Sequence, residues 1–133
     1  MGIVGQILLA VLSFTSVVGI LRYDFDRHHV FNPSWSPHAR FHAACFAILS
    51  MGVHLMAGIV VSWLPFGRGD SFIVSSTLLV INGGTLLAAS LVKGTSTNAG
   101  PHEKVWKSYP ISIWMVGVYL VVIAIGLYLG LAG

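Results

Sequence analysis

Charged residues are scarce in this sequence, at 8% of 133 residues. Soluble domains are about 25% charged, so a soluble globular domain is excluded, and disordered and coiled-coil chains are excluded with it. The formal net charge of +3 comes from seven Lys and Arg against four Asp and Glu, too few basic residues to follow a phosphate backbone. We therefore expect no nucleic-acid partner. Cysteine occurs once, at Cys45, which excludes a disulfide within the chain and a cysteine-cluster metal site.

Apolar stretches are what the sequence does contain, because hydrophobic residues make up 56% of it. Four of the stretches are long enough to cross the ~30 Å hydrocarbon layer as helices. We predict an all-α integral membrane protein, a single domain over residues 1–133 folded as a four-transmembrane-helix bundle in the lipid bilayer. The spans are expected at Ile3–Leu21, Phe41–Leu64, Phe72–Val92 and Ile111–Leu131, with a histidine-rich segment at 22–40 and a second loop at 93–110.

The basic residues of the connecting segments indicate the orientation in the membrane. The two long loops hold six of the seven basic residues, and the short turn between the second and third spans holds only Arg68. Because Lys and Arg gather in cytoplasmic loops, we predict both long loops in the cytoplasm and both termini outside, in a bacterial plasma membrane. The six are Arg22, Arg27, Arg40, Lys93, Lys104 and Lys107.

The histidine-rich segment ends with the features of a helix start. Ser36 is a good N-cap, and Pro37 suits the first helical position because it has no backbone N–H to leave unpaired. His38 and His42 are four residues apart, so their imidazoles lie side by side on one face of the first turn. We predict this pair at the cytoplasmic mouth of the second span.

Two imidazoles beside a cation suggest acid–base chemistry. His38 or His42 would be the general acid or base, because histidine titrates near neutral pH. Arg40 would form a cationic pocket with them and bind a carboxylate, phosphate or enolate oxygen of the substrate; the alternative for Arg40 is a side chain that simply reaches the membrane surface. Asp24 or Asp26 would orient the imidazole, and Asp26 is our third catalytic candidate.

Asn32 and Trp35 are candidates for contacts with the substrate. Asn32 and Ser36 each precede a proline, which biases them toward extended backbone, so residues 32–35 are predicted to form an ordered turn. Trp35 would be either a lid over the substrate or an aromatic anchor at the membrane interface. The sequence leaves both roles open.

A transition metal is the alternative ligand for the same side chains. Imidazoles four residues apart can chelate such a metal, and the candidate ligands are His29, His38, His42 and Asp26. No cofactor is assigned, because a histidine pair without a defined third ligand is a weak signal. Further ligands would come from Asp24, His28, His102 or Glu103.

The run HHVFNPSWSPHARFH, from His28 to His42, resembles the signature of a family of small, uncharacterised multi-span membrane proteins of bacteria and fungi. That signature reads H-V/I-F-N-P-x-W-x-P-H-A-R/K-F-H. The resemblance implies a multi-span membrane protein and marks this segment as its site, but it implies no activity. The signature positions fall on His29, Asn32, Pro33, Trp35, Pro37, His38, Arg40, Phe41 and His42.

Each predicted span also carries a hydrogen-bonding residue near the middle of the membrane: Ser13, His54, Asn82 and Tyr119. At about 1.5 Å per residue, His54 lies ~15 Å from the outer end of its helix. We predict a hydrogen bond from His54 to Asn82 or Tyr119. His54 is then either a further catalytic residue, with Asn82 and Tyr119 contacting the substrate, or a structural link between helices. His42 lies on a different face of the second span from His54. That face is a candidate for contact with lipid.

Gly126 and Gly130 form a GxxxG spacing in the fourth span. Small residues let membrane helices approach closely. This face therefore packs either inside the bundle or against a second copy of the chain in a homo-oligomer.

These patterns favour a small integral-membrane enzyme that uses histidine acid–base chemistry on a hydrophobic small molecule with a polar head group. Isomerisation, cyclisation, hydration or proton abstraction beside a carbonyl would suit such a site. Hydride transfer does not, because the chain has no GxGxxG nucleotide-binding pattern. The alternative is a non-enzymatic accessory subunit, or a metal- or solute-binding subunit that works as an oligomer.

Overall fold

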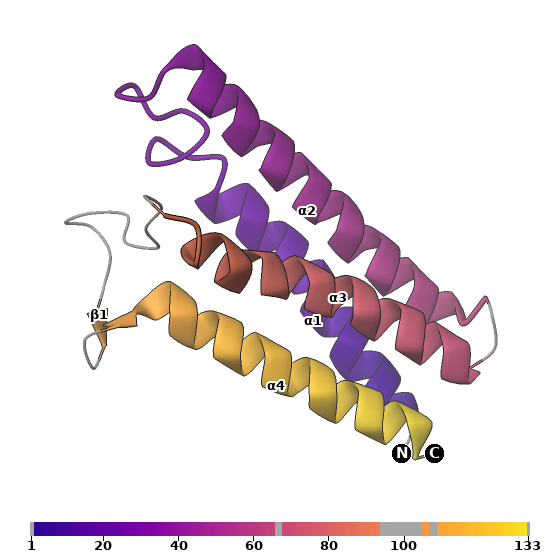
Figure 1. Cartoon of the computed structure of the whole chain (residues 1–133). Coiled ribbons are helices and arrows are strands. Elements are labelled where there is room, and N and C mark those ends of the chain that lie inside the picture. Colours follow the sequence, from indigo (N-terminus) through magenta and orange to yellow (C-terminus); the bar gives the residue numbers. More distant parts are fainter. Residues whose placement is uncertain (1, 66–67, 94–104, 107–108, 133) are drawn as a thin grey trace.

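The computed structural model describes residues 2–65, 68–93, 105–106 and 109–132, which form four helices and a short hairpin (Figure 1). The helices are α1 (Gly2–Tyr23), α2 (Pro37–Trp63), α3 (Arg68–Ser90) and α4 (Ile111–Leu131). The two-residue strands β1 (Val105–Trp106) and β2 (Tyr109–Pro110) pair antiparallel just before α4. All four helices are long and apolar enough to cross a membrane. The chain is therefore an all-α integral membrane protein with four transmembrane helices.

The two ends of α2 follow from local sequence signals. Ser36 caps the start, because its Oγ accepts a hydrogen bond from the Ala39 backbone N–H at 3.2 Å. The predicted cap is confirmed, and the helix begins at Pro37, one turn before the predicted span. The helix ends where Leu64 adopts left-handed backbone with a φ of 48° and its N–H donates to the Val60 carbonyl at 3.0 Å.

The third helix begins earlier than the apolar run does. The predicted span starts at Phe72, whereas α3 starts at Arg68. Asp70 lies in its first turn, where a negative charge is favourable beside the positive end of the helix dipole. The polar first turn is therefore helical although it lies outside the apolar stretch.

The four helices are arranged in sequence order around the bundle. α1 packs against α2 and α4, and α3 packs against the same two neighbours. Both termini lie at one end of the bundle with the α2–α3 turn, while residues 24–36 and the β1–β2 hairpin lie at the other end (Figure 1). The first part of α2 projects beyond the other helices at that second end.

The interior of the bundle is lined mainly by small and polar residues. Ser13, Ser71 and Ser75 are fully buried, whereas many large apolar side chains are exposed on the outside, among them Leu49 and Val118. Lipid is as apolar as leucine, so membrane helices gain nothing by hiding large apolar side chains and pack through small ones. The buried apolar core is correspondingly small and consists of Leu9, Ala57, Val61, Phe72, Leu79 and Ile123.

α1 and α4 pack closely where Gly5 of α1 meets Gly126 and Gly130 of α4. A Cβ atom at Gly5 would lie 2.5 Å from the carbonyl oxygen of Gly126 and 2.8 Å from the Cα of Gly130. A Cβ at Gly126 would overlap Leu9, and one at Gly130 would overlap Phe72. The GxxxG face of α4 is therefore filled by α1 and α3 of the same chain, and a homo-oligomer would need another surface.

Candidate functional site

The segment between α1 and α2, here called the histidine loop (residues 24–36), is ordered by hydrogen bonds. Val30 is buried, and its backbone N–H donates to the Asp24 carbonyl at 3.1 Å. Asn32 Nδ2 donates to the His28 carbonyl at 2.9 Å, and Asn32 Oδ1 accepts from the N–H and the hydroxyl of Ser34 at 3.0 and 2.7 Å. The predicted ordered turn is present, and the Asn32 amide is engaged inside it.

Asp26 and His29 form a carboxylate–imidazole pair within this loop. Asp26 Oδ1 accepts the backbone N–H of His28 at 2.8 Å and that of His29 at 3.0 Å, and it lies 3.1 Å from His29 Nδ1. Because a carboxylate accepts, Nδ1 carries the proton of the His29 ring and the Nε2 lone pair is left to act as a base. The His29 and Asp26 side chains are 38% and 28% exposed, so this Asp26–His29 dyad is accessible from outside the chain.

The two carboxylates of the loop are shifted in opposite directions. Burial raises the pKa of Asp24 above its ordinary value of 3.8, and the nearby His29 offsets this only in part. Burial also acts to raise the pKa of Asp26, but the hydrogen bonds from the backbone of His28 and from His29 outweigh it, so this pKa lies below 3.8. Asp26 is therefore ionised at neutral pH and can orient His29.

We expect the turn around Asp26 to loosen in acid. A carboxyl group with a lower pKa in the folded than in the unfolded state stabilises the fold above its unfolded pKa, and this stabilisation is lost as the pH falls through its folded pKa. For Asp26 this window lies below pH 3.8. The amide proton shifts of His28 and His29 in NMR spectra should titrate together below that pH, and should not do so in Asp26→Asn. The same joint titration below pH 3.8 in Asp26→Asn would contradict the assignment.

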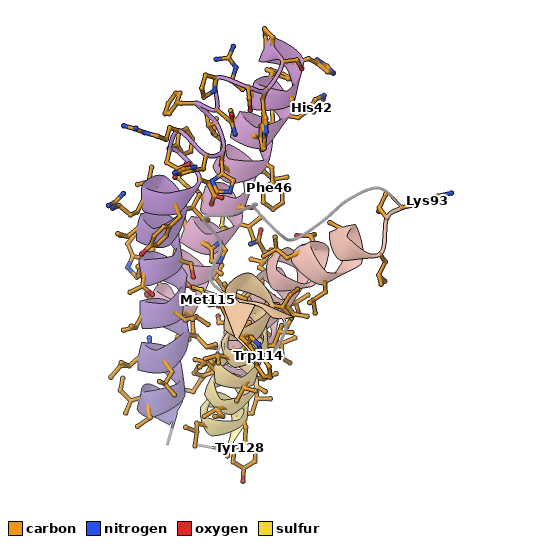
Figure 2. All side chains as sticks on the ribbon, turned by 90° about the vertical axis from the view of Figure 1, so that its left-hand side faces the viewer. His42, Phe46, Lys93, Trp114, Met115 and Tyr128 are labelled. Atoms are coloured by element: carbon orange, nitrogen blue, oxygen red, sulfur yellow. The ribbon has the colours of Figure 1, made fainter. Side chains whose placement is uncertain are left out.

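His38 and His42 form a second pair, on the outside of the first turns of α2. Their Nε2 atoms are 3.1 Å apart, and the rings stand perpendicular with centroids 4.5 Å apart. Both side chains are exposed, and Figure 2 shows His42 on the projecting end of α2, on the side away from α1. One Nε2–H donates and the other Nε2 accepts, so the two rings share one hydrogen bond.

Arg40 does not join this pair. With about 3.6 residues per turn, Arg40 leaves α2 on the opposite side from His38 and His42, because the helix is regular from Pro37 onward. Arg40 is half-buried, and its Nε atom is buried without a hydrogen-bond partner in the described part of the chain. The predicted cationic pocket of these three side chains does not form.

Trp35 lies beside His29 of the Asp26–His29 dyad. Its ring stands edge-on to that of His29, with the centroids 6.5 Å apart and the planes at 87°. Trp35 is 38% exposed. It therefore places an apolar surface beside the candidate base, where the tail of an amphiphile can pack.

The candidate metal ligands are divided between the two pairs. Asp26 bonds to His29, and His38 contacts His42. Among the residues that the structure describes, no three His, Cys, Asp or Glu side chains gather closely enough to hold a metal ion. The further candidates His102 and Glu103 lie outside the described residues.

No protein family model, curated protein or solved structure matches this chain.

His54 of α2 is linked to α4 in the middle of the bundle. Its Nδ1–H donates to the Ser50 carbonyl at 2.8 Å, which leaves Nε2 to accept from the Tyr119 hydroxyl at 2.9 Å. The Tyr119 oxygen also lies 3.4 Å from the Leu79 carbonyl oxygen of α3. The predicted hydrogen bond of His54 is thus made to Tyr119, while Asn82 is half-buried on α3 and is not its partner.

The burial of His54 bears on its role. The side chain is 3% exposed, which suits a link between helices better than contact with a substrate. Ser13, predicted at the same level, donates to the Leu9 carbonyl of its own helix at 2.7 Å. A catalytic role for His54, with Asn82 and Tyr119 at the substrate, stays a prediction.

The sequence patterns indicate His29 only as a candidate metal ligand. They do not predict the pairing of His29 with Asp26. The usable signal is the spacing Asp-x-x-His from Asp26 to His29. An Asp side chain can accept from the backbone N–H groups two and three residues later. This turn brings the ring of the third residue back to the carboxylate, as observed here.

Proposed function

We propose that this chain is a small integral-membrane enzyme that uses histidine acid–base chemistry on a hydrophobic substrate with a polar head group. The observation that supports this is the Asp26–His29 dyad, with 3.1 Å between Oδ1 and Nδ1. It follows α1 by a few residues, so it lies where a membrane helix emerges from the bilayer. A head group lies at this level while its tail stays in the bilayer.

The chemistry of the dyad is proton transfer. His29 Nε2 takes a proton from a carbon or oxygen of the substrate, and the Asp26 carboxylate stabilises the imidazolium that forms. The ring then returns the proton to the same or a neighbouring atom. Isomerisation, cyclisation, hydration and proton abstraction beside a carbonyl all use these steps. Trp35 would pack against the apolar part of the substrate next to the head group.

The charge distribution supports a cytoplasmic location for the dyad. Arg22, Arg27 and Arg40 flank or lie within the segment that carries it. Lys93 comes three residues after the last residue of α3, and that end of α3 lies at the same end of the bundle (Figure 1). At the other end of the bundle, Arg68 is the first residue of α3. By the positive-inside rule the histidine loop faces the cytoplasm and both termini face outside.

Deuterium uptake tests this proposal without knowledge of the substrate. The purified chain in phosphatidylcholine vesicles is incubated in heavy water with a bacterial lipid extract and with sets of long-chain ketones, enones and prenyl alcohols. We expect at least one component to gain deuterium, seen by mass spectrometry, faster than in vesicles without protein. His29→Asn should slow this uptake by about 10²-fold or more, because the base is lost.

His28→Asn is the matched control, since it removes the neighbouring imidazole but keeps the backbone N–H that Asp26 binds. It should leave the uptake unchanged. Equal uptake by His29→Asn and the unaltered chain would overturn the role of the dyad. No uptake with any component would overturn the enzyme proposal and favour a non-enzymatic accessory or solute-binding subunit.

A further inference from the structure

The exposed pair His38 and His42 takes no part in the Asp26–His29 dyad. The two Nε2 atoms are 3.1 Å apart, and the ring planes stand at 90°. In the described part of the chain, the only hydrogen bond of either ring is the one between them. Each ring also contacts Phe41, which lies stacked on His38 and edge-on to His42. The two imidazoles therefore face each other on an open surface, with an aromatic ring beside both.

The distance between the two Nε2 atoms suits chelation of a metal ion. Imidazole nitrogens bind Zn²⁺ at about 2.0–2.1 Å, so two of them 3.1 Å apart enclose an angle of about 100° at the metal. This angle lies between the ~90° of a tetragonal Cu²⁺ site and the ~109° of a tetrahedral Zn²⁺ site. Both histidines lie in regular helix, so a rotation of the exposed rings brings both nitrogens onto one ion without movement of the backbone.

Metal binding would replace the hydrogen bond between the two rings. Without metal, one Nε2 carries a proton and the other accepts it. A bound ion needs both Nε2 lone pairs, so each neutral ring then carries its proton on Nδ1. Neither Nδ1 of His38 and His42 is engaged by another described residue. The change of tautomer therefore costs only the one exposed hydrogen bond.

The pair lies where ions dissolved in water can reach it. α2 has 27 residues and is about 40 Å long at 1.5 Å per residue, longer than the ~30 Å hydrocarbon layer. His38 and His42 lie in its first turns, in the part that projects beyond the other helices (Figure 1). No third His, Cys, Asp or Glu of the described residues joins them, so water completes the coordination.

We propose that His38 and His42 chelate one divalent transition-metal ion, Zn²⁺ or Cu²⁺, through their two Nε2 atoms, with water in the other coordination positions. Imidazole suits these two ions, whereas Mg²⁺ and Ca²⁺ prefer oxygen ligands. Cu²⁺ binds more tightly than Zn²⁺ to the same nitrogen ligands. The site shares no residue with the Asp26–His29 dyad and does not depend on the proposed enzyme function.

Titration of the full chain with each metal tests this proposal. The chain, without an affinity tag, is placed in phosphatidylcholine vesicles and titrated with Zn²⁺, Cu²⁺ or Mg²⁺ in a calorimeter. We expect one Zn²⁺ or Cu²⁺ per chain and no binding of Mg²⁺. His38→Gln and His42→Gln should each weaken binding about 10²-fold, because a single imidazole has no second ligand held beside it. Both side chains are exposed, so circular dichroism should show an unchanged helix content.

Two controls and one spectrum make the outcome decisive. His28→Gln removes another exposed histidine at the same end of the chain, and Cys45→Ser removes an exposed thiol three residues after His42; neither should change the affinity. The electron paramagnetic resonance spectrum of the Cu²⁺ complex should show two bound imidazole nitrogens, and one in either single variant. Equal affinity in His38→Gln and the unaltered chain would show surface-adsorbed ions only and overturn the proposal. Half an ion per chain would also overturn it, because two copies would then share the metal.

Discussion

Gly5→Ala is expected to lower the free energy of unfolding by about 2 kcal/mol, the usual cost of adding a methyl group to a closely packed site. The new Cβ would lie 2.5 Å from the Gly126 carbonyl oxygen and 2.8 Å from the Gly130 Cα. These are backbone atoms of α4 and cannot rotate away as a flexible side chain can. The helices must separate at their crossing, which also loosens the contacts of Leu9 beside it. Equilibrium unfolding in mixed detergent micelles measures the change.

Gly19→Ala is the matched control on the same helix. A Cβ at Gly19 would meet nothing within 4 Å. Alanine is also the better helix former by about 1 kcal/mol, so this variant should be neutral or more stable. Opposite effects of the two substitutions would establish the close α1–α4 crossing. If Gly5→Ala and Gly19→Ala change stability by the same amount, the crossing is not as close as the structure places it.

Asp26→Asn is expected to reduce the rate of the proposed proton transfer by about 10²- to 10⁴-fold. The amide can still accept the backbone N–H groups of His28 and His29, so the turn is retained. It carries no charge to stabilise the imidazolium, and it no longer forces the proton of His29 onto Nδ1. Because Asp26 positions the base and does not touch the substrate, kcat should fall while KM stays the same.

Asp24→Asn is the control for that experiment. Asp24 lies in the same loop, but the group that it contributes to the Val30 turn is its backbone carbonyl, which the substitution keeps. The Asp24 carboxylate acts on His29 only through its charge and forms no hydrogen bond with it among those that hold the dyad. The rate should therefore fall much less than in Asp26→Asn. A fall in kcat of similar size in Asp24→Asn and Asp26→Asn would indicate a general disturbance of the loop. A large rise in KM in Asp26→Asn would indicate a role in binding.

Local signals in the sequence were sufficient to predict much of the framework. The apolar runs predicted all four helices, and Ser36 with Pro37 predicted where α2 begins. The His38–His42 pair followed from helical spacing, as did its separation from His54 on another face. The predicted position of Arg40 beside these two histidines is wrong, because a helix sends residues two apart to opposite sides.

The side-chain partners between elements were less predictable. The sequence places Asn82 and Tyr119 at the same depth as His54, so either could be its hydrogen-bond partner. The rotation of α3 and α4 about their own axes places Tyr119 at His54. The GxxxG spacing was compatible with a second copy until Gly5 of α1 was found against it.

By itself the sequence determined that this chain is a four-helix membrane protein with a histidine-rich segment at one end. The physical reason is that hydrocarbon provides no hydrogen-bond partners, so each apolar run must satisfy its own backbone as a helix. Only the tertiary structure decided that Asp26 orients His29, that the glycine face of α4 is covered by α1 and α3, and that Tyr119 is the partner of His54. Those relations depend on the path of a loop and the rotation of each helix, which are set by packing between residues far apart in the chain.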